Sequence, residues 1–323
     1  MDLAQHTPRV RIQASTDVLI VTYLGLLLLF FMFTVGANWK YSVDLQVLKD
    51  VAGIYPFAND PAGALADNSF LVWISLAFGP VLAVNTTLAS LYVLAFALKT
   101  ALLLRYFGLS ATLALTLLFF FSVDLNQARL SLCLSMLLLA WHTQNQRRTL
   151  RAAIFVVLGV LFHYPAGATL LAFYFVTRYP TATFIAAGAA GIGAVVAMFS
   201  EDSPLIRYLI YFNVDSDNST ASSFYLITLS LVLIYWKRLS KVQAVIALSA
   251  VLVSFVARDL VNLSGRLAEL TALCVATSSF IMGGHRRELV RRSNLFLLIA
   301  AAFFLYRFNQ WVIQGNMPMP SNL

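Results

Sequence analysis

Apolar runs of membrane-spanning length recur along almost the whole chain, and no other feature restricts its fold as strongly. A helix needs about 20 mainly apolar residues to cross the hydrocarbon of a bilayer. A backbone in hydrocarbon must satisfy its own hydrogen bonds, so an all-α bundle is expected. Only 11% of the residues are charged, against about 25% in soluble domains. The sequence therefore predicts an all-α polytopic membrane protein, with residues 1–323 forming a single integral membrane domain.

Eleven segments are predicted to be transmembrane helices, several of them short. They are Val18–Gly36, Val84–Leu104, Ser110–Ser122, Gln127–Trp141, Ala152–Phe162, Ala166–Thr177, Thr181–Phe199, Ser223–Trp236, Val242–Ala257, Leu267–Gly283 and Asn294–Ile313. The apolar segment Phe70–Pro80 is too short to cross, so it is expected to form a re-entrant or interfacial helix. The first span is longer than the ~7–15-residue core of a signal peptide, and we expect it to remain as an anchor.

The distribution of basic residues predicts the orientation, because cytoplasmic loops of membrane proteins are enriched in Lys and Arg. With the N-terminus inside, 15 of the 22 basic residues lie in cytoplasmic loops. They are Arg9, Arg11, Lys99, Arg105, Arg147, Arg148, Arg151, Arg178, Lys237, Arg238, Lys241, Arg286, Arg287, Arg291 and Arg292. The same topology places the larger hydrophilic loops, residues 37–69 and 200–222, and the C-terminus on the external side.

Several functional classes are excluded by the motifs that the sequence lacks. It contains no Walker loop, no Gly-rich dinucleotide fingerprint and no Cys/His spacing typical of a metal site. An ATP-driven transporter domain is therefore absent from this chain. The two cysteines, Cys133 and Cys274, lie within predicted spans and do not indicate a disulfide framework.

Polar side chains gather at four places on the predicted external face. They are Asp44 in the first loop; Asp124, Asn126, Gln127 and Arg129; His163 and Tyr164; and Arg258, Asp259, Asn262, Arg266 and Glu269. Ionisable groups within or beside membrane spans are functional candidates by default.

Each of these groups also has a structural interpretation. Arg129 fits an interfacial anchor whose head lies among lipid phosphates, and His163 fits a helix cap. Arg266 and Glu269 are three residues apart on a predicted helix, so they fit a local ion pair. Asp44 fits a solvated loop residue. The residues alone leave these alternatives open.

Taken together, the external arginines are the pattern expected for an anionic ligand such as a pyrophosphate. Arginine presents a planar fork of donors that matches phosphate oxygens in bidentate fashion. Glycosyl transfer from a lipid diphosphate needs such donors, because charge develops on the departing diphosphate. It also needs a base that takes the proton of the attacking sugar hydroxyl, for which a carboxylate and an imidazole are available.

Four features follow one another along the chain: the segment Asn126-Gln127-Ala128-Arg129-Leu130, an apolar helix, a basic turn and the segment Leu161-Phe162-His163-Tyr164. In this order they resemble the EpsG/Wzy group of bacterial polysaccharide polymerases. Asp44 in the loop after the first span, and Gly265-Arg266 at the start of a late helix, resemble the same group. The likeness extends over roughly Val18 to Gly283. Leu48 and Ala52 stand where tyrosines are expected, which is a departure from the pattern.

This resemblance implies a polymerase of undecaprenyl-diphosphate-linked repeat units of O-antigen or exopolysaccharide. It implies a GT-C-like bundle in the bacterial inner membrane, with the active site on the periplasmic face. Asp44 and His163 would be catalytic, Asp44 being the favoured base, and Arg129 and Arg266 would bind the diphosphate. The further substrate-binding candidates are Arg258, Tyr164, Asn126 and Glu269.

No metal or other cofactor is implied, because arginine can neutralise the diphosphate. The expected partners are the lipid-linked donor and acceptor, membrane lipids and a chain-length regulator, with no nucleic acid. Another periplasmic GT-C transferase or an O-antigen ligase is the alternative within the same class. A flippase or transporter is less favoured, because transporters carry charges near the midplane and the charges here are expected at one membrane face.

Overall fold

The chain is helical throughout the part that the computed structural model describes, which comprises residues 16–36, 84–125, 127–176, 179–198, 219–237, 239–256, 263–281 and 286–315. These ranges contain eleven α-helices and no β-strand. The helices are α1 (Thr16–Phe31), α5 (Val84–Phe107), α6 (Leu109–Phe119), α7 (Ala128–Asn145), α8 (Thr149–Phe162), α9 (Tyr164–Phe175), α10 (Pro180–Met198), α11 (Ser219–Tyr235), α12 (Lys241–Val256), α13 (Leu263–Ile281) and α14 (Arg286–Phe308). π-helical segments extend three of them, at Met32–Gly36, Phe120–Asp124 and Asn309–Ile313.

Each of the eleven apolar segments predicted from the sequence forms one of these helices. Most ends differ by a few residues, but α14 begins at Arg286, eight residues before the predicted start. Three helical stretches, Thr16–Thr34, Ala89–Phe107 and Asn294–Ile313, are long and apolar enough to cross a membrane. Six other apolar helices in the described ranges are shorter. The all-α character is therefore confirmed, whereas eleven transmembrane crossings stay a prediction. The predicted interfacial helix Phe70–Pro80 lies outside the described residues.

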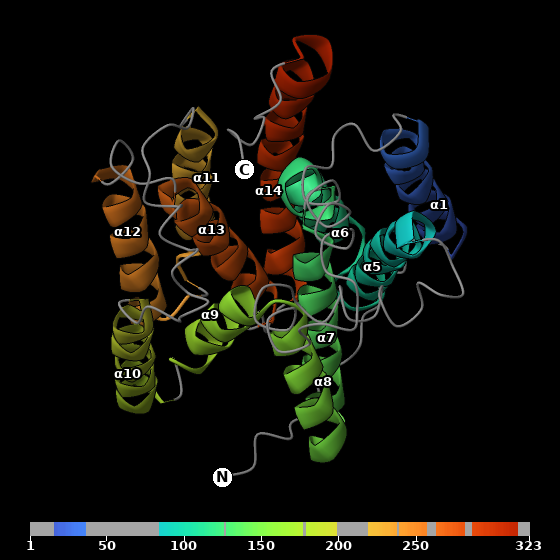
Figure 1. Ribbon diagram of the computed structural model, residues 1–323. Helices are drawn as coiled ribbons and strands as arrows, with labels where there is room; N and C mark the ends of the chain where they lie inside the picture. Colours follow the sequence, from blue (N-terminus) through green and yellow to red (C-terminus); the bar gives the residue numbers. More distant parts are fainter. Residues whose placement is uncertain are drawn as a thin grey trace.

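The helices form two groups that meet near the start of α7 (Figure 1). In the first group, α5 packs on both α6 and α7, α1 packs on the outer side of α5, and α8 folds back along α7 as a hairpin. In the second group, α13 packs against both α11 and α12. Two elements link the groups: α14 packs along α6 and also contacts α11, and α9 contacts both α7 and α13.

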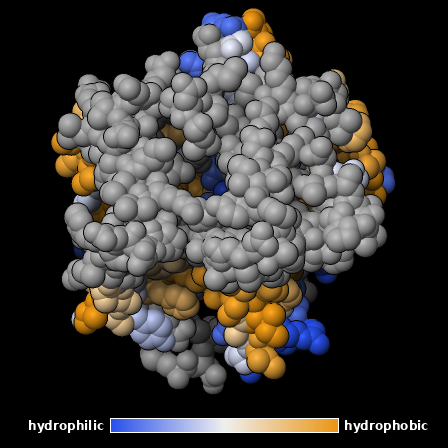
Figure 2. Space-filling model, in the orientation of Figure 1, coloured by the Kyte–Doolittle hydropathy of each residue, from blue (hydrophilic) through white to orange (hydrophobic). Residues whose placement is uncertain are grey.

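The outward sides of several helices are strongly apolar. Leu24 of α1, Leu252 of α12 and Leu298 of α14 are 57%, 63% and 70% exposed, respectively. Figure 2 shows hydrophobic residues gathered on both flanks and toward the lower edge of the described part of the molecule. Monomeric soluble proteins rarely expose apolar surface on this scale. An exterior of this kind is compatible with a membrane protein whose helices face lipid.

An aromatic cluster joins the beginning of the π segment Phe120–Asp124 to two helices of the first group. The rings of Phe30 in α1 and Phe96 in α5 stack with their centroids 4.2 Å apart. Phe120 lies edge-on to both rings, at 6.2 Å from each. Edge-to-face and offset stacked arrangements are the favoured geometries of aromatic pairs. The cluster therefore fixes where the π segment begins relative to α5.

Candidate functional site

The chain reverses direction between α6 and α7 within a few buried residues. In the π segment, the Leu125 N–H donates to the Phe120 carbonyl at 2.9 Å. Gln127 then leaves helical geometry, with φ −131° and ψ 64°, and its N–H donates to the Val123 carbonyl at 2.7 Å. π-helical turns are rare and occur frequently at functional sites. Here the turn ends at Asp124, whose side chain is buried in the bundle.

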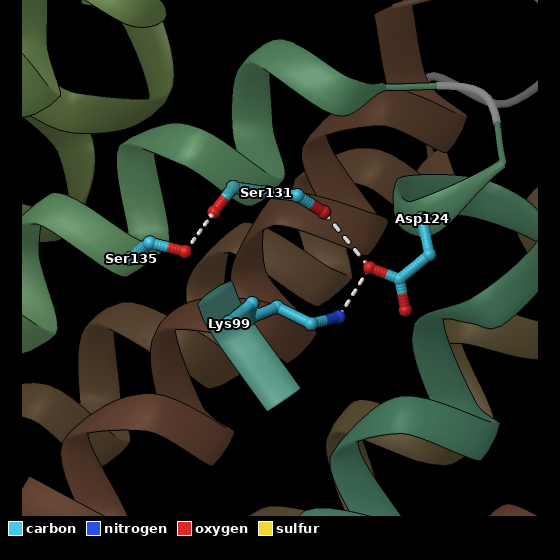
Figure 3. A network of polar contacts seen from close by, with 4 residues as sticks. All are labelled: Lys99, Asp124, Ser131 and Ser135. Carbon is cyan, nitrogen blue, oxygen red and sulfur yellow. Dashed lines mark hydrogen bonds and ion pairs between the residues drawn. The ribbon is translucent and has the colours of Figure 1, made fainter. Parts of the chain in front are cut away.

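One carboxylate oxygen of Asp124 joins three helical elements (Figure 3). Asp124 Oδ1 forms an ion pair with Lys99 Nζ of α5 and accepts a hydrogen bond from Ser131 Oγ of α7 at 2.8 Å. Ser135 Oγ donates to the Ser131 backbone carbonyl at 2.8 Å and so extends the polar line along α7. The Lys99 ammonium also lies 5.6 Å from the centroid of the Phe96 ring, where the π electrons attract it. Asp124 Oδ2 is buried with no hydrogen-bond partner among the described residues.

Lys99 corrects one prediction of the sequence analysis. We expected it in a cytoplasmic loop, but it lies inside α5 and is only 3% exposed. An isolated lysine near the predicted end of a span normally extends its ammonium to water. Here Asp124, from another element, neutralises it instead, and a buried charge needs such a partner. Lys99 therefore lies within a candidate membrane span, Ala89–Phe107, and not in a loop.

Two of the predicted substrate-binding segments, far apart in the sequence, meet at the start of α7. Gln127 Nε2 lies 3.4 Å from Glu269 Oε1 and 3.5 Å from Oε2, at the long end of the hydrogen-bond range. The same amide donates to the Ser122 carbonyl at 3.2 Å. Gln127 and Glu269 are both buried, so this contact lies inside the bundle. Arg129 follows two residues later on α7 and is half-buried.

A further cation, Arg307 of α14, is buried among aromatic rings. Its guanidinium carbon lies 5.2 Å from the Phe303 ring centroid, 5.7 Å from that of Trp311 and 6.0 Å from that of Phe224. Glu269 attracts the same guanidinium electrostatically. Arg307 was not among the candidate site residues predicted from the sequence. The structure shows that it belongs to the charged group around Glu269.

The charged residues around the start of α7 carry a positive excess. The described members are three cations, Lys99, Arg129 and Arg307, and two carboxylates, Asp124 and Glu269, so one positive charge remains when the two signs are subtracted. Charges interact far more strongly in a low-dielectric interior than in water. The arrangement therefore favours an anionic ligand over a cationic one.

His163 separates α8 from α9 and acts as a helix cap. Its backbone N–H donates to the Gly159 carbonyl at 3.4 Å, and its Nδ1 accepts the Ala166 N–H at 3.3 Å. Because Nδ1 accepts this hydrogen bond, the neutral ring carries its proton on Nε2. In that tautomer the outer edge of the ring donates rather than accepts a proton. This geometry favours a capping and positioning role for His163 over the role of general base.

The other predicted site residues are only partly placed. Asp44, Asn126 and Arg258 lie outside the described residues. Tyr164 is the first residue of α9, and Arg266 lies on α13 one turn before Glu269. The side chains of Tyr164 and Arg266 also lie outside the described part of the structure. Positions three apart lie on the same side of a helix, so Arg266 and Glu269 share one side of α13.

The sequence carries a usable signal for only one of the two cations that the analysis missed. Phe303, Arg307 and Trp311 are spaced four residues apart, which places them on one helix face and predicts that the guanidinium lies between the two rings. Lys99 is conspicuous only as a single charge in an apolar run. Its partner is 25 residues away, beyond an intervening helix, so a local pattern cannot identify it.

Within the described ranges, no group of three or more His, Cys, Asp or Glu side chains is placed to hold a metal ion. Comparisons with protein-family models, curated proteins and solved structures give no significant match to this chain. The function is therefore inferred from the chemistry of the residues around the start of α7.

Proposed function

We propose that the chain is a membrane glycosyltransferase that polymerises undecaprenyl-diphosphate-linked repeat units at the periplasmic face of the bacterial inner membrane. The observation that carries the proposal is the buried contact between Gln127 and Glu269. It brings together the start of α7, with Arg129, and the turn of α13 that begins near Arg266. These are the two segments that the resemblance to polysaccharide polymerases assigns to diphosphate binding.

The chemistry of the site suits a departing diphosphate. Its charges have a positive excess, and arginine donors oriented before the reaction stabilise charge that develops on a leaving group. Arg129 is half-buried, so its guanidinium is partly shielded from competing water, which strengthens its interactions. Glu269 and Gln127 would hold the arginine-bearing helices in register while accepting or donating hydrogen bonds to sugar hydroxyls.

The role of base remains with Asp44 in this proposal. In its tautomer the free edge of the His163 ring carries a proton and cannot take one up. Asp124 is already engaged by Lys99 and Ser131. A carboxylate from the first external loop would then approach the acceptor hydroxyl from outside the bundle. His163 would position the start of α9 and donate a hydrogen bond to the substrate.

A transporter of a lipid-linked or other anionic substrate is the second candidate function. The buried Lys99–Asp124 pair favours it, because charged pairs within membrane spans often mark ion or substrate pathways. The transferase is preferred because the charged side chains that are buried in the described structure, Lys99, Asp124, Glu269 and Arg307, lie around one helix start. Another periplasmic transferase or a ligase would use the same donor and differ in its acceptor.

Reconstitution of the purified protein with a lipid-linked repeat unit, without any ion gradient, separates these functions. A polymerase forms glycans of increasing length and releases undecaprenyl diphosphate. A ligase forms a product only when a different acceptor lipid is added. Gradient-dependent movement of the lipid across the vesicle, with no new glycosidic bond, would show that the proposal is wrong.

Replacing Arg129 with Lys tests the diphosphate contact. Lysine keeps the positive charge but lacks the planar fork, so polymer formation should fall sharply while the amount of protein in the membrane stays normal. Arg151→Lys is the matched control, because Arg151 is exposed at the first turn of α8, away from the site. Full polymer length in Arg129→Lys and Arg129→Ala cells would exclude Arg129 from the reaction.

The predicted sidedness is tested with single cysteines in a protein lacking Cys133 and Cys274. A membrane-impermeant thiol reagent applied to intact spheroplasts should label cysteines beside Asp44 and His163, and leave one beside Arg148 unlabelled. Labelling beside Arg148 from outside would place the start of α7 at the cytoplasmic face and contradict a periplasmic active site.

A further inference from the structure

We infer that Lys99 is a positioning residue: through Asp124 and Ser131, it holds the start of α7, and hence Gln127 and Arg129, in place. The inference concerns geometry, and its consequence for ligand binding rests on the proposed diphosphate site. Lys99 itself belongs to α5 and contacts none of the proposed substrate-binding residues directly in the described structure. It acts by fixing a carboxylate that three elements share.

The reversal before α7 has other fixed points on the far side from α5: Phe121 packs against the rings of Phe304 and Trp311, and Gln127 lies within reach of Glu269. The backbone bonds from Leu125 and Gln127 tie the reversal only to its own preceding turn. No side chain caps the start of α7. Among the described contacts, Asp124 is the residue that links this reversal both forward to α7, through Ser131, and sideways to α5, through Lys99.

Near Lys99, α5 is itself held in place by aromatic packing. Phe96, one turn before Lys99, stacks on Phe30 of α1 and meets Phe120 edge-on. Phe120 opens the π segment and Asp124 ends it, so α5 holds both ends of the segment, one by ring packing and the other by charge. Both ends of the segment that delivers the chain to α7 are therefore fixed against the same helix.

The stability of the folded protein does not by itself account for the Lys99–Asp124 ion pair. A buried ion pair is often no more stable than well-packed apolar residues of similar volume. A pair that adds little stability can still select one arrangement of the helices over others. Gln127 and Arg129 follow Asp124 by three and five residues, so a shift of this carboxylate moves both of them.

The experiment measures the geometry of the α7 start separately from ligand binding. Cysteines replace Gln127 and Glu269 in a chain carrying Cys133→Ala and Cys274→Ala, and a short bifunctional thiol reagent reports how closely the two positions approach. In chains with the native Gln127 and Glu269, binding of undecaprenyl diphosphate is measured in lipid nanodiscs. Both readouts are normalised to the amount of folded protein, measured by size-exclusion chromatography.

The decisive variant is Lys99→Met/Asp124→Asn, which removes both charges together and leaves no unpaired buried ion. An apolar cavity lined in part by Leu103, Leu134 and Leu273 adjoins Lys99 and accommodates the methionine. We expect nearly normal folding, a severalfold loss of cross-linking and a dissociation constant at least about tenfold higher, since a shift of about 1 Å can cost as much as about a hundredfold in a positioned site.

Two further variants make the result interpretable if the double variant folds poorly. Ser131→Ala keeps the ion pair but removes its link to α7, so cross-linking should fall in part. Lys99→Arg keeps the charge and should cross-link normally. Thr100→Val is the matched control, because Thr100 is the next residue of α5, is fully buried and is replaced by a side chain of the same shape; it should change neither readout.

Wild-type cross-linking and affinity in both the double variant and Ser131→Ala would overturn the inference and leave the pair with a purely structural role. The two proposals fail in different ways. If the wild-type protein does not bind undecaprenyl diphosphate, the proposed function fails, whereas the cross-linking series still decides whether Lys99 positions the start of α7.

Discussion

The two ends of α7 are closed by different kinds of interaction. At its beginning, Asp124 and Gln127 are buried, and side chains from other elements complete the turn. At its end the backbone alone closes the helix: the Arg148 N–H donates to the Thr143 carbonyl at 3.1 Å, and the Arg147 N–H donates to the Gln144 carbonyl at 2.9 Å. This pair of bonds is a Schellman motif, with Arg147 in the left-handed conformation at φ 60°.

The surroundings of the two ends of α7 also differ, because one end is exposed and the other is buried. The end of α7 is exposed and basic, and aromatic rings lie beside it: Tyr106 is 4.2 Å from the His142 ring, and Phe107 stacks on Trp141 at 5.6 Å. Aromatic residues next to basic ones are typical of a membrane–water boundary. An exposed residue of the closing turn, such as Arg148, can change without affecting the packing of other helices. At the buried end, one side chain fixes several helices, so a conservative change there should have wide effects.

The largest predicted effect is therefore at Asp124. Asp124→Asn removes the counter-charge of Lys99 while keeping the size of the side chain. Breaking a buried ion pair from one side costs about 3–5 kcal/mol, because the remaining charge is unpaired. We expect most of the protein to be lost from the membrane fraction, which immunoblotting of membranes would measure.

The comparison is sharpened by making a similar change at the other end. Arg148→Gln also removes one charge, but from an exposed turn, and its effect on the amount of protein should be small. If Asp124→Asn were as abundant as Arg148→Gln, the ion pair would not stabilise the buried end, and the contrast between the two ends would disappear.

The next prediction concerns the α8–α9 break, where Gly167 faces α8. A Cβ added at Gly167 would lie 3.0 Å from the Val160 Cα and 3.4 Å from the Cys133 sulfur, so the backbone of α8 would have to move by a few tenths of an ångström. Gly167→Ala should destabilise the protein by about 1–3 kcal/mol through overpacking. The melting temperature in detergent should fall. Gly188→Ala is the control, because nothing lies within 4 Å of its added Cβ.

Local patterns predicted the helices better than they predicted the site. Apolar runs identified all eleven described α-helices, because burial in lipid or in the bundle demands the same residue types along a whole segment. They did not show that α6 ends in a π segment, since an inserted residue leaves no periodic mark over five positions. They also misplaced Lys99, because its environment depends on Asp124, which only the folded chain brings close.

The same distinction applies to pairs within the site. Arg266 and Glu269 are neighbours in sequence, and a local ion pair was one open interpretation of them. The structure places Gln127, 142 residues away, within hydrogen-bond reach of Glu269. The Arg266 side chain lies outside the described residues, so the local ion pair stays a prediction. Sequence spacing identifies which residues share a helix face, but it does not identify the element that packs on that face.

A smaller effect is expected at His163, and it separates capping from proton transfer. Asparagine can accept the Ala166 N–H in place of Nδ1, so His163→Asn should fold normally and keep most of its activity. His163→Ala loses the cap and should be destabilised by about 1 kcal/mol. Thermal melting and polymer formation are measured for both variants. An inactive but fully stable His163→Asn protein would restore His163 as an acid or base.

The smallest effect is expected at the exposed end of α7, from Arg147→Gly. A left-handed conformation costs a residue with a Cβ about 1–2 kcal/mol, which glycine avoids. Glycine also gives up more backbone freedom on folding, and the basic charge near the helix end is lost. We therefore expect a net gain below about 1 kcal/mol and unchanged activity, seen as a slightly higher melting temperature. Gln146→Gly is the control: at φ −87° no strain is relieved, so the protein should become less stable. Equal effects of the two substitutions would mean that the backbone strain at Arg147 does not contribute to the stability of this end.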